Sequence, residues 1–188
     1  MRTMLTRLQD ERGQGLIELI VAMVVITVAV LALMAAYDEG FVSLHKSART
    51  NAAVTLAETQ LELYGALPYA SIGLSSSLLT TAKASDAFYS TDEAALSPTG
   101  TDVTNAGCDT TSAQCLPVQA SIKGSDGRNY RIETFVRDVT QSLTCQGVVG
   151  SCGSTTERDV TVIVRDPSAS GTPTVYTVTA AFDSGPRS

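Results

Sequence analysis

Hydrophobic residues are concentrated near the N-terminus of the 188-residue chain. From Leu19 to Tyr37 the chain runs for 19 residues without a charge, and Thr27 is the one clearly polar side chain before Tyr37. As a helix this run extends about 28 Å, close to the thickness of the hydrocarbon core of a bilayer. Its Leu, Ile and Val residues together favour insertion by about 3–6 kcal/mol. The pattern predicts one membrane-spanning helix at about residues 16–37.

The charges beside this run predict its orientation. Arg2, Arg7 and Arg12 lie on its N-terminal side, so the positive-inside rule places that end in the cytoplasm and the rest of the chain outside. Two other interpretations stay open. One is a buried core helix, for which an apolar run of this length is unusual. The other is a secretory signal peptide, for which the run is long and Leu33-Met34-Ala35 is a poor cleavage site.

Helical periodicity persists after the membrane segment. Apolar residues recur there at three- and four-residue steps, and Gly65 and Pro68 are stop signals. We therefore expect one N-terminal helix over residues 14–67, whose second half packs on the globular part of the chain. The recurring apolar positions are Phe41, Leu44, Ala48, Val54, Ala57, Leu61 and Tyr64.

Two regions of different character make up the expected extracytoplasmic globular head at residues 68–188. In 71–114, 24 of 44 residues are Ser, Thr, Gly, Asn or Asp, which predicts a long polar surface loop. In 115–188, four alternating runs separated by turns predict an antiparallel sheet with one face exposed to water and the helix on the other. The predicted fold class is α+β, a long N-terminal helix packed on a four-stranded antiparallel sheet. The expected inward residues are Val118, Ala120 and Ile122; Tyr130, Ile132, Thr134 and Val136; Val160, Val162 and Val164; and Tyr176, Val178, Ala180 and Phe182.

All four cysteines lie beyond the membrane segment. Cys108 and Cys115 are seven residues apart, and so are Cys145 and Cys152. Outside the cytoplasm this arrangement favours two local disulfides. Zinc binding is the competing interpretation, but the spacing does not fit a finger or a ribbon and no His lies nearby. Other pairings of the same four residues stay open.

Charge and residue content argue against several classes of function. The chain has 13 Lys and Arg against 19 Asp and Glu, a net charge of −6, and lacks the clustered cations that bind nucleic acid. Lys123, Arg128, Arg131 and Arg137 would form at most a small basic patch on the exposed strand face. With one His in the chain, His-based metal sites and Ser-His-Asp triads are not expected. We expect no catalytic site, cofactor or metal, and therefore no enzyme.

The residues that precede the apolar run resemble the processing site of type IV pilins and pseudopilins. The run Gly13-Gln14-Gly15-Leu16-Ile17-Glu18-Leu19 follows a short charged segment and leads into the apolar helix. In that family a leader ends in Gly, a prepilin peptidase cuts immediately after it, and the new N-terminal residue is methylated. The resemblance implies a leader peptide at residues 1–13, cleavage between Gly13 and Gln14, and Glu18 as the fifth residue of the mature chain.

The resemblance also gives Glu18 a role in subunit assembly. In pilin filaments this Glu neutralises the N-terminal amine of a neighbouring subunit, and two opposite charges buried together cost far less than one alone. In the other interpretation, Glu18 only caps the helix N-terminus at the headgroup boundary, where a negative charge is favourable.

Downstream residues resemble minor subunits of the PilV and GspI type. These are Ala57-Glu58-Thr59-Gln60-Leu61-Glu62, Leu67-Pro68-Tyr69 and Ala22-Met23-Val24, so the resemblance covers about residues 1–70. Most type IV pilins begin with Phe after the cut, whereas this chain would begin with Gln14 and then Gly15. A Gly-Gln start is also seen in Tad-type pseudopilins, which are processed in a similar way.

The resemblance implies a pilin-like fold and a structural minor subunit of a type IV pilus or a related secretion filament, displayed at the cell surface after assembly. Its implied partners are prepilin peptidase, other pilin or pseudopilin subunits, an inner-membrane assembly platform and, before assembly, membrane lipid. The alternative is a membrane-anchored or secreted binding module that does not polymerise.

Overall fold

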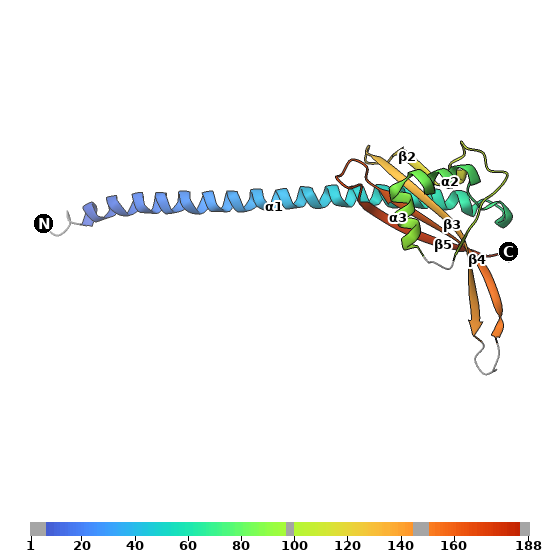
Figure 1. Ribbon diagram of the computed structural model, residues 1–188. Helices are drawn as coiled ribbons and strands as arrows, with labels where there is room; N and C mark the ends of the chain where they lie inside the picture. The colour runs from blue at the N-terminus through green and yellow to red at the C-terminus, as the bar shows by residue number, and fades with distance from the viewer. Residues whose placement is uncertain (1–6, 97–99, 145–150, 185–188) are drawn as a thin grey trace. The chain divides into compact units, whose positions relative to one another are not determined.

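The computed structural model describes residues 7–96, 100–144 and 151–184, without the side chains of residues 7–14, 141–144 and 151–155. The chain divides into two compact units, an anchor unit (residues 1–47) and a head (residues 48–188). Helix α1 (Arg7–Gly65) contributes to both units (Figure 1). The head therefore contains the last part of α1 as well as the C-terminal two thirds of the chain.

Helix α1 is continuous because no proline interrupts it between Arg7 and Gly65. Its end agrees with the stop signals in the sequence. The Ala66 N–H still donates to the Glu62 carbonyl at 3.0 Å, and Pro68 then starts a short 3₁₀ turn. The predicted long N-terminal helix is confirmed.

A five-stranded antiparallel sheet forms the centre of the head. The long strands β3 (Asn129–Thr144) and β4 (Ser151–Arg165) pair with each other, and β5 (Thr174–Phe182) pairs with β4. On the other side of β3 lie β2 (Val118–Lys123) and the two-residue strand β1 (Thr101–Asp102). The helix and the sheet confirm the predicted α+β class, and β1 brings the number of strands to five.

The head part of α1 covers one face of this sheet. Small side chains on the helix, including Ala52, Ala53 and Ala57, are fully buried and allow its backbone to approach the strands closely. The hydroxyl of Tyr130 donates to the Arg49 carbonyl at 3.3 Å. The residues predicted to point inward from β3 and β4 are all buried: Tyr130, Ile132, Thr134, Val136, Val160, Val162 and Val164.

The prediction for β2 was wrong at Ala120, which is exposed. The pairing of β2 with β3 shifts between Gln119 and Ile122, and such a bulge breaks the alternation of side chains between the two faces. Gln119 is buried instead, and its amide donates to the Gln60 amide oxygen at 3.0 Å. An uncharged polar residue thus occupies a position in the core.

The prediction of a polar loop over residues 71–114 was also wrong in part. The segment contains α2 (Ser76–Ser85) and α3 (Ala87–Ala95). A helix that packs on one side needs few apolar residues, and here Leu79 and Tyr89 are among the buried ones. Threonine hydroxyls on α2 donate to carbonyl groups one turn earlier, so a helix rich in hydroxyl residues is compatible with these side chains.

The second face of the sheet was predicted to be exposed to water, and this was wrong over β3 and β4, where α3 lies on it. Phe135 on β3 is 2% exposed, and its ring stacks on that of Tyr89 with 4.3 Å between centroids. The Tyr89 hydroxyl donates to the Thr134 carbonyl at 3.1 Å. The second face is therefore covered over β3 and β4, whereas alternate side chains of β5 stay exposed.

Candidate processing and assembly site

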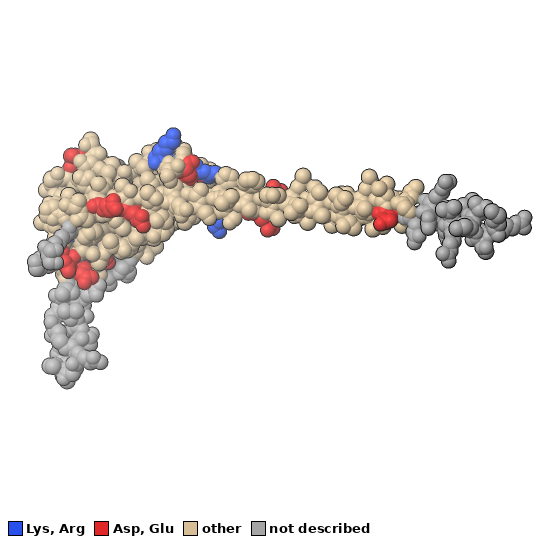
Figure 2. Space-filling view, turned by 180° about the vertical axis from the view of Figure 1, so that it is seen from behind, with Lys and Arg blue, Asp and Glu red and all other residues tan. Residues whose placement is uncertain are grey.

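Within the anchor unit, α1 presents an apolar surface that nothing in the described structure covers. Its large apolar side chains from Leu16 to Leu44 are 44–69% exposed, and none of its most apolar 18-residue window is buried. Uncharged side chains cover most of this helix in Figure 2. Exposing so much apolar surface to water is unfavourable, so lipid or other helices must cover it. The helix is long and apolar enough to cross a membrane once, as predicted.

The three residues predicted for processing and assembly lie on this helix. Gly13 and Gln14 are inside the bounds of α1, and the structure does not describe the Gln14 side chain. Glu18 lies one turn further along and is exposed, and none of the interactions found among the described residues involves it. Residues four apart lie on the same face of a helix, about 6 Å apart along its axis. Gln14 and Glu18 therefore share one face of α1.

The comparisons with known proteins identify this segment. The prokaryotic N-terminal methylation motif matches residues 8–34, a range that contains Gly13, Gln14, Glu18 and most of the predicted membrane span. No curated protein matches the chain, and no solved structure does. The chain carries a prepilin motif of the type IV pilin kind.

This motif supports a protein of the type IV pilin or pseudopilin kind that is processed as a prepilin. It points to a structural protein rather than an enzyme, and implies prepilin peptidase and other pilins as partners. The apolar helix and the motif together support anchoring by a single membrane pass. Membership of the PilV and GspI class stays a prediction.

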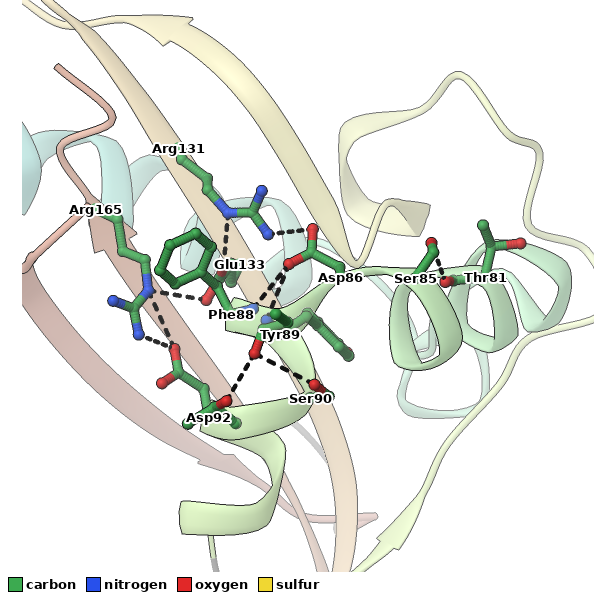
Figure 3. Close-up of polar contacts among 12 residues, drawn as sticks. Thr81, Ser85, Asp86, Phe88, Tyr89, Ser90, Asp92, Arg131, Glu133 and Arg165 are labelled. Carbon is green, nitrogen blue, oxygen red and sulfur yellow. Dashed lines mark hydrogen bonds and ion pairs between the residues drawn. The ribbon is translucent and has the colours of Figure 1, made fainter. Parts of the chain in front are cut away.

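A cluster of charged groups in the head lies between α3 and the sheet (Figure 3). Arg131 on β3 donates to Asp86 at 2.5 Å and to Glu133 at 2.6 Å. Arg165 on β4 donates to Asp92 at 2.5 Å and to the other oxygen of Glu133 at 3.2 Å. The two guanidinium groups therefore connect α3, at its N-cap and at Asp92, to the central strands, and they share the Glu133 carboxylate.

The electrostatics of this cluster indicate a structural role. Glu133 is 0% exposed, and burial and a hydrogen bond with Asp92 raise its pKa, against the effect of the two arginines. Asp86 is the N-cap of α3, since its carboxylate accepts the N–H groups of Phe88 and Tyr89 at 3.1 Å. Although burial acts to raise the pKa of Asp86, the hydrogen bonds from Arg131 and these N–H groups lower it.

The described residues show no arrangement suited to metal chemistry, because no three His, Cys, Asp or Glu side chains among them could hold an ion. The small basic patch predicted on the strand face is not formed as expected. Arg131 is committed to its ion pairs, and Arg137 donates to the Gly100 carbonyl at 2.8 Å and pairs with Asp102 at 3.5 Å. Both arginines hold segments of the head together.

The disulfide between Cys108 and Cys115, whose Cα atoms are 5.4 Å apart, closes a short loop. This loop contacts the end of α1. Two side chains of α1 donate to carbonyl groups of this loop. They are the Gln60 amide, at 3.0 Å to the residue 113 carbonyl, and the Tyr64 hydroxyl, at 2.6 Å to the residue 114 carbonyl. Cys145 and the side chain of Cys152 are outside the described residues, and so is the second predicted disulfide.

Replacing both Cys108 and Cys115 by Ser should lower the free energy of unfolding of the head by about 2–3 kcal/mol, because the unfolded chain regains the freedom of a short loop. The measurement is denaturant unfolding of the full chain in detergent, followed by near-UV circular dichroism. Replacing the exposed Thr110 in the same loop by Ala, with the disulfide intact, is the control. Equal unfolding midpoints for the double variant and the unsubstituted chain would contradict the expectation.

Replacing Asp86 by Asn should lower the free energy of unfolding by about 1–2 kcal/mol at pH 7, because the charged partner of Arg131 is lost while an N-cap acceptor remains. The pKa of Asp86 is lower in the folded than in the unfolded state. Its ionised form therefore contributes stability above the unfolded-state pKa, and this contribution is lost as the pH falls through the folded-state pKa.

The difference between Asp86→Asn and the unsubstituted chain should accordingly shrink as the pH is lowered from 7 to 3, in the same unfolding measurement. Asp38→Asn, which removes an exposed carboxylate from α1, serves as the control and should behave like the unsubstituted chain throughout. A difference that stays constant over this pH range would rule out the ion pair as its source.

Proposed function

We propose that the protein is a structural minor subunit, a pilin or pseudopilin, of a type IV pilus or a related secretion filament. The observation that carries the proposal is the methylation motif at residues 8–34 together with the uncovered apolar helix that overlaps it. A simple membrane anchor needs neither a peptidase site nor a carboxylate at the start of its helix.

Processing creates the group that Glu18 is proposed to bind. Prepilin peptidase cuts after Gly13 and leaves the amine of Gln14 at the start of α1. This amine and the Glu18 carboxylate are four residues apart on one helix face, so two neighbouring α1 helices can each present one charge to the other. Pairing removes most of the cost of burying either charge among apolar helices.

The driving force for assembly is the burial of apolar surface. In the membrane, lipid covers the side chains of the anchor unit, and in the filament the helices of other subunits take the place of lipid. The positive-inside rule places residues 1–13 in the cytoplasm. The head then lies outside the cytoplasm, where the Cys108–Cys115 disulfide is stable.

Replacing Gly13 by Leu should block cleavage, because the larger side chain would hinder the extended backbone in the peptidase site. The unsubstituted chain from native membranes should begin at Gln14 and carry about 14 Da of added mass from one methyl group. Gly15→Leu is the matched control, since a side chain at that position meets no atom within 4 Å. Intact mass and N-terminal sequencing distinguish the species. An unsubstituted chain that starts at Met1, or one cut near Ala35, would instead indicate an anchored or secreted binding module.

Replacing Glu18 by Gln should leave processing intact but reduce the chain in sheared surface filaments about tenfold or more, because the amine of a neighbour would lose its buried partner. Immunoblots of the membrane and filament fractions measure this ratio. Glu39→Gln removes another exposed carboxylate from α1 and should leave the ratio unchanged. Equal filament-to-membrane ratios for the two variants would show that Glu18 has no specific role in assembly.

A further inference from the structure

Strand β5 forms one edge of the head sheet, and β4 is its one partner strand within the described part of the chain (Figure 1). Its nine residues, Thr174–Phe182, include no charged residue, no proline and no glycine. Its side chains are alternately exposed and half-buried over most of its length. An edge strand of this kind presents a row of backbone N–H and C=O groups that can pair with a further strand.

The opposite edge of the sheet is protected by devices that β5 lacks. Strand β2 is six residues long, is interrupted by the bulge between Gln119 and Ile122, and ends in Lys123. Bulges, charged residues and short strands are the features by which proteins prevent pairing at an edge. The pairing of β5 with β4 has one shift, near its start, and is regular from Tyr176 to Phe182. Among the described residues, the sheet of the head therefore has one edge protected against further pairing and one open edge.

We propose that the open edge of β5 accepts an antiparallel strand from a different membrane-anchored subunit, and that this strand is uncharged and rich in β-branched residues. The absence of charge along β5 selects against Lys, Arg, Asp or Glu beside its half-buried face, because such a charge would lose water there without gaining an opposite charge. The Thr161 and Thr179 hydroxyls are already 2.9 Å apart across β4 and β5. A Thr or Val in the added strand would extend this cross-strand row.

A second copy of the same chain does not fit this edge. Identical heads cannot join β5 to β2, because β2 is blunted. Two β5 strands paired antiparallel would be related by a two-fold axis perpendicular to the sheet, so the α1 segments over the two sheets would run in opposite directions. In one membrane all chains insert in the same direction. This choice of partner rests on the proposed function, in which the subunits share a membrane.

The experiment places a photo-reactive amino acid, p-benzoylphenylalanine, at single exposed positions of the full chain in native membranes. Thr177 and Ala181 probe β5, and Ser121 on β2 is the matched control on the other edge. The expected result is an adduct from both β5 positions that peptide mass spectrometry maps to one strand of a second membrane-anchored protein. The two contact points should run antiparallel to β5, and position 121 should give no such adduct. Thr177→Lys should remove the adduct at position 181, whereas Ser121→Lys should leave it unchanged.

Three results would overturn the proposal: adducts to a second copy of the chain, adducts of equal yield from β2, or no adduct from β5. The N-terminus of the chain is read in the same samples. Processing at Gln14 without a β5 adduct would leave the proposed function standing and remove the strand pairing. A mapped β5 adduct on a chain that is not processed would leave the strand pairing standing and remove the proposed function.

Discussion

The structure depends on one constraint, the need to keep the apolar half of α1 out of water. An uncharged helix long enough to cross a bilayer is favourable in lipid or among similar helices and unfavourable elsewhere. A protein built on such a helix must hold its other functions in a part that folds independently. The division of the chain near residue 47 meets this need, because the core of the head begins with Ala52 and Ala53 and uses no apolar side chain of the anchor unit.

The head covers the two faces of its central strands β3 and β4 in different ways. Against α1 the contact is made mainly by small and branched apolar side chains. Against α3 it is made by the Tyr89–Phe135 ring pair and by the carboxylates and guanidinium groups around Glu133. Removing one member of a buried ion pair leaves an uncompensated charge. The charged positions under α3 therefore tolerate fewer substitutions than the apolar positions under α1.

Periodicity in the sequence predicted α1 and the three long strands because each repeats its pattern over many residues. The prediction failed where an element is short or where its contacts come from distant parts of the sequence. Helix α3 rests on few buried side chains, although Asp86 before Phe88 and Tyr89 is an N-cap signal that could have located its start. Arg131 was placed on the water-exposed strand face because its partner Asp86 lies far away in the sequence. The methylation motif could be recognised from the sequence because its residues are contiguous. The open edge of β5 could not, because it depends on which strands pair.

The buried amide pair between Gln60 and Gln119 has a consequence for the uniqueness of the fold. Apolar contacts between a helix and a sheet tolerate sliding, because one methyl group can replace another. If α1 moved by one turn, Leu56 or Tyr64 would face Gln119 in place of Gln60, and the hydrogen bond between the two buried amides would be lost. The pair therefore disfavours shifted positions of α1 on the sheet, even though it adds little to the stability of the observed position.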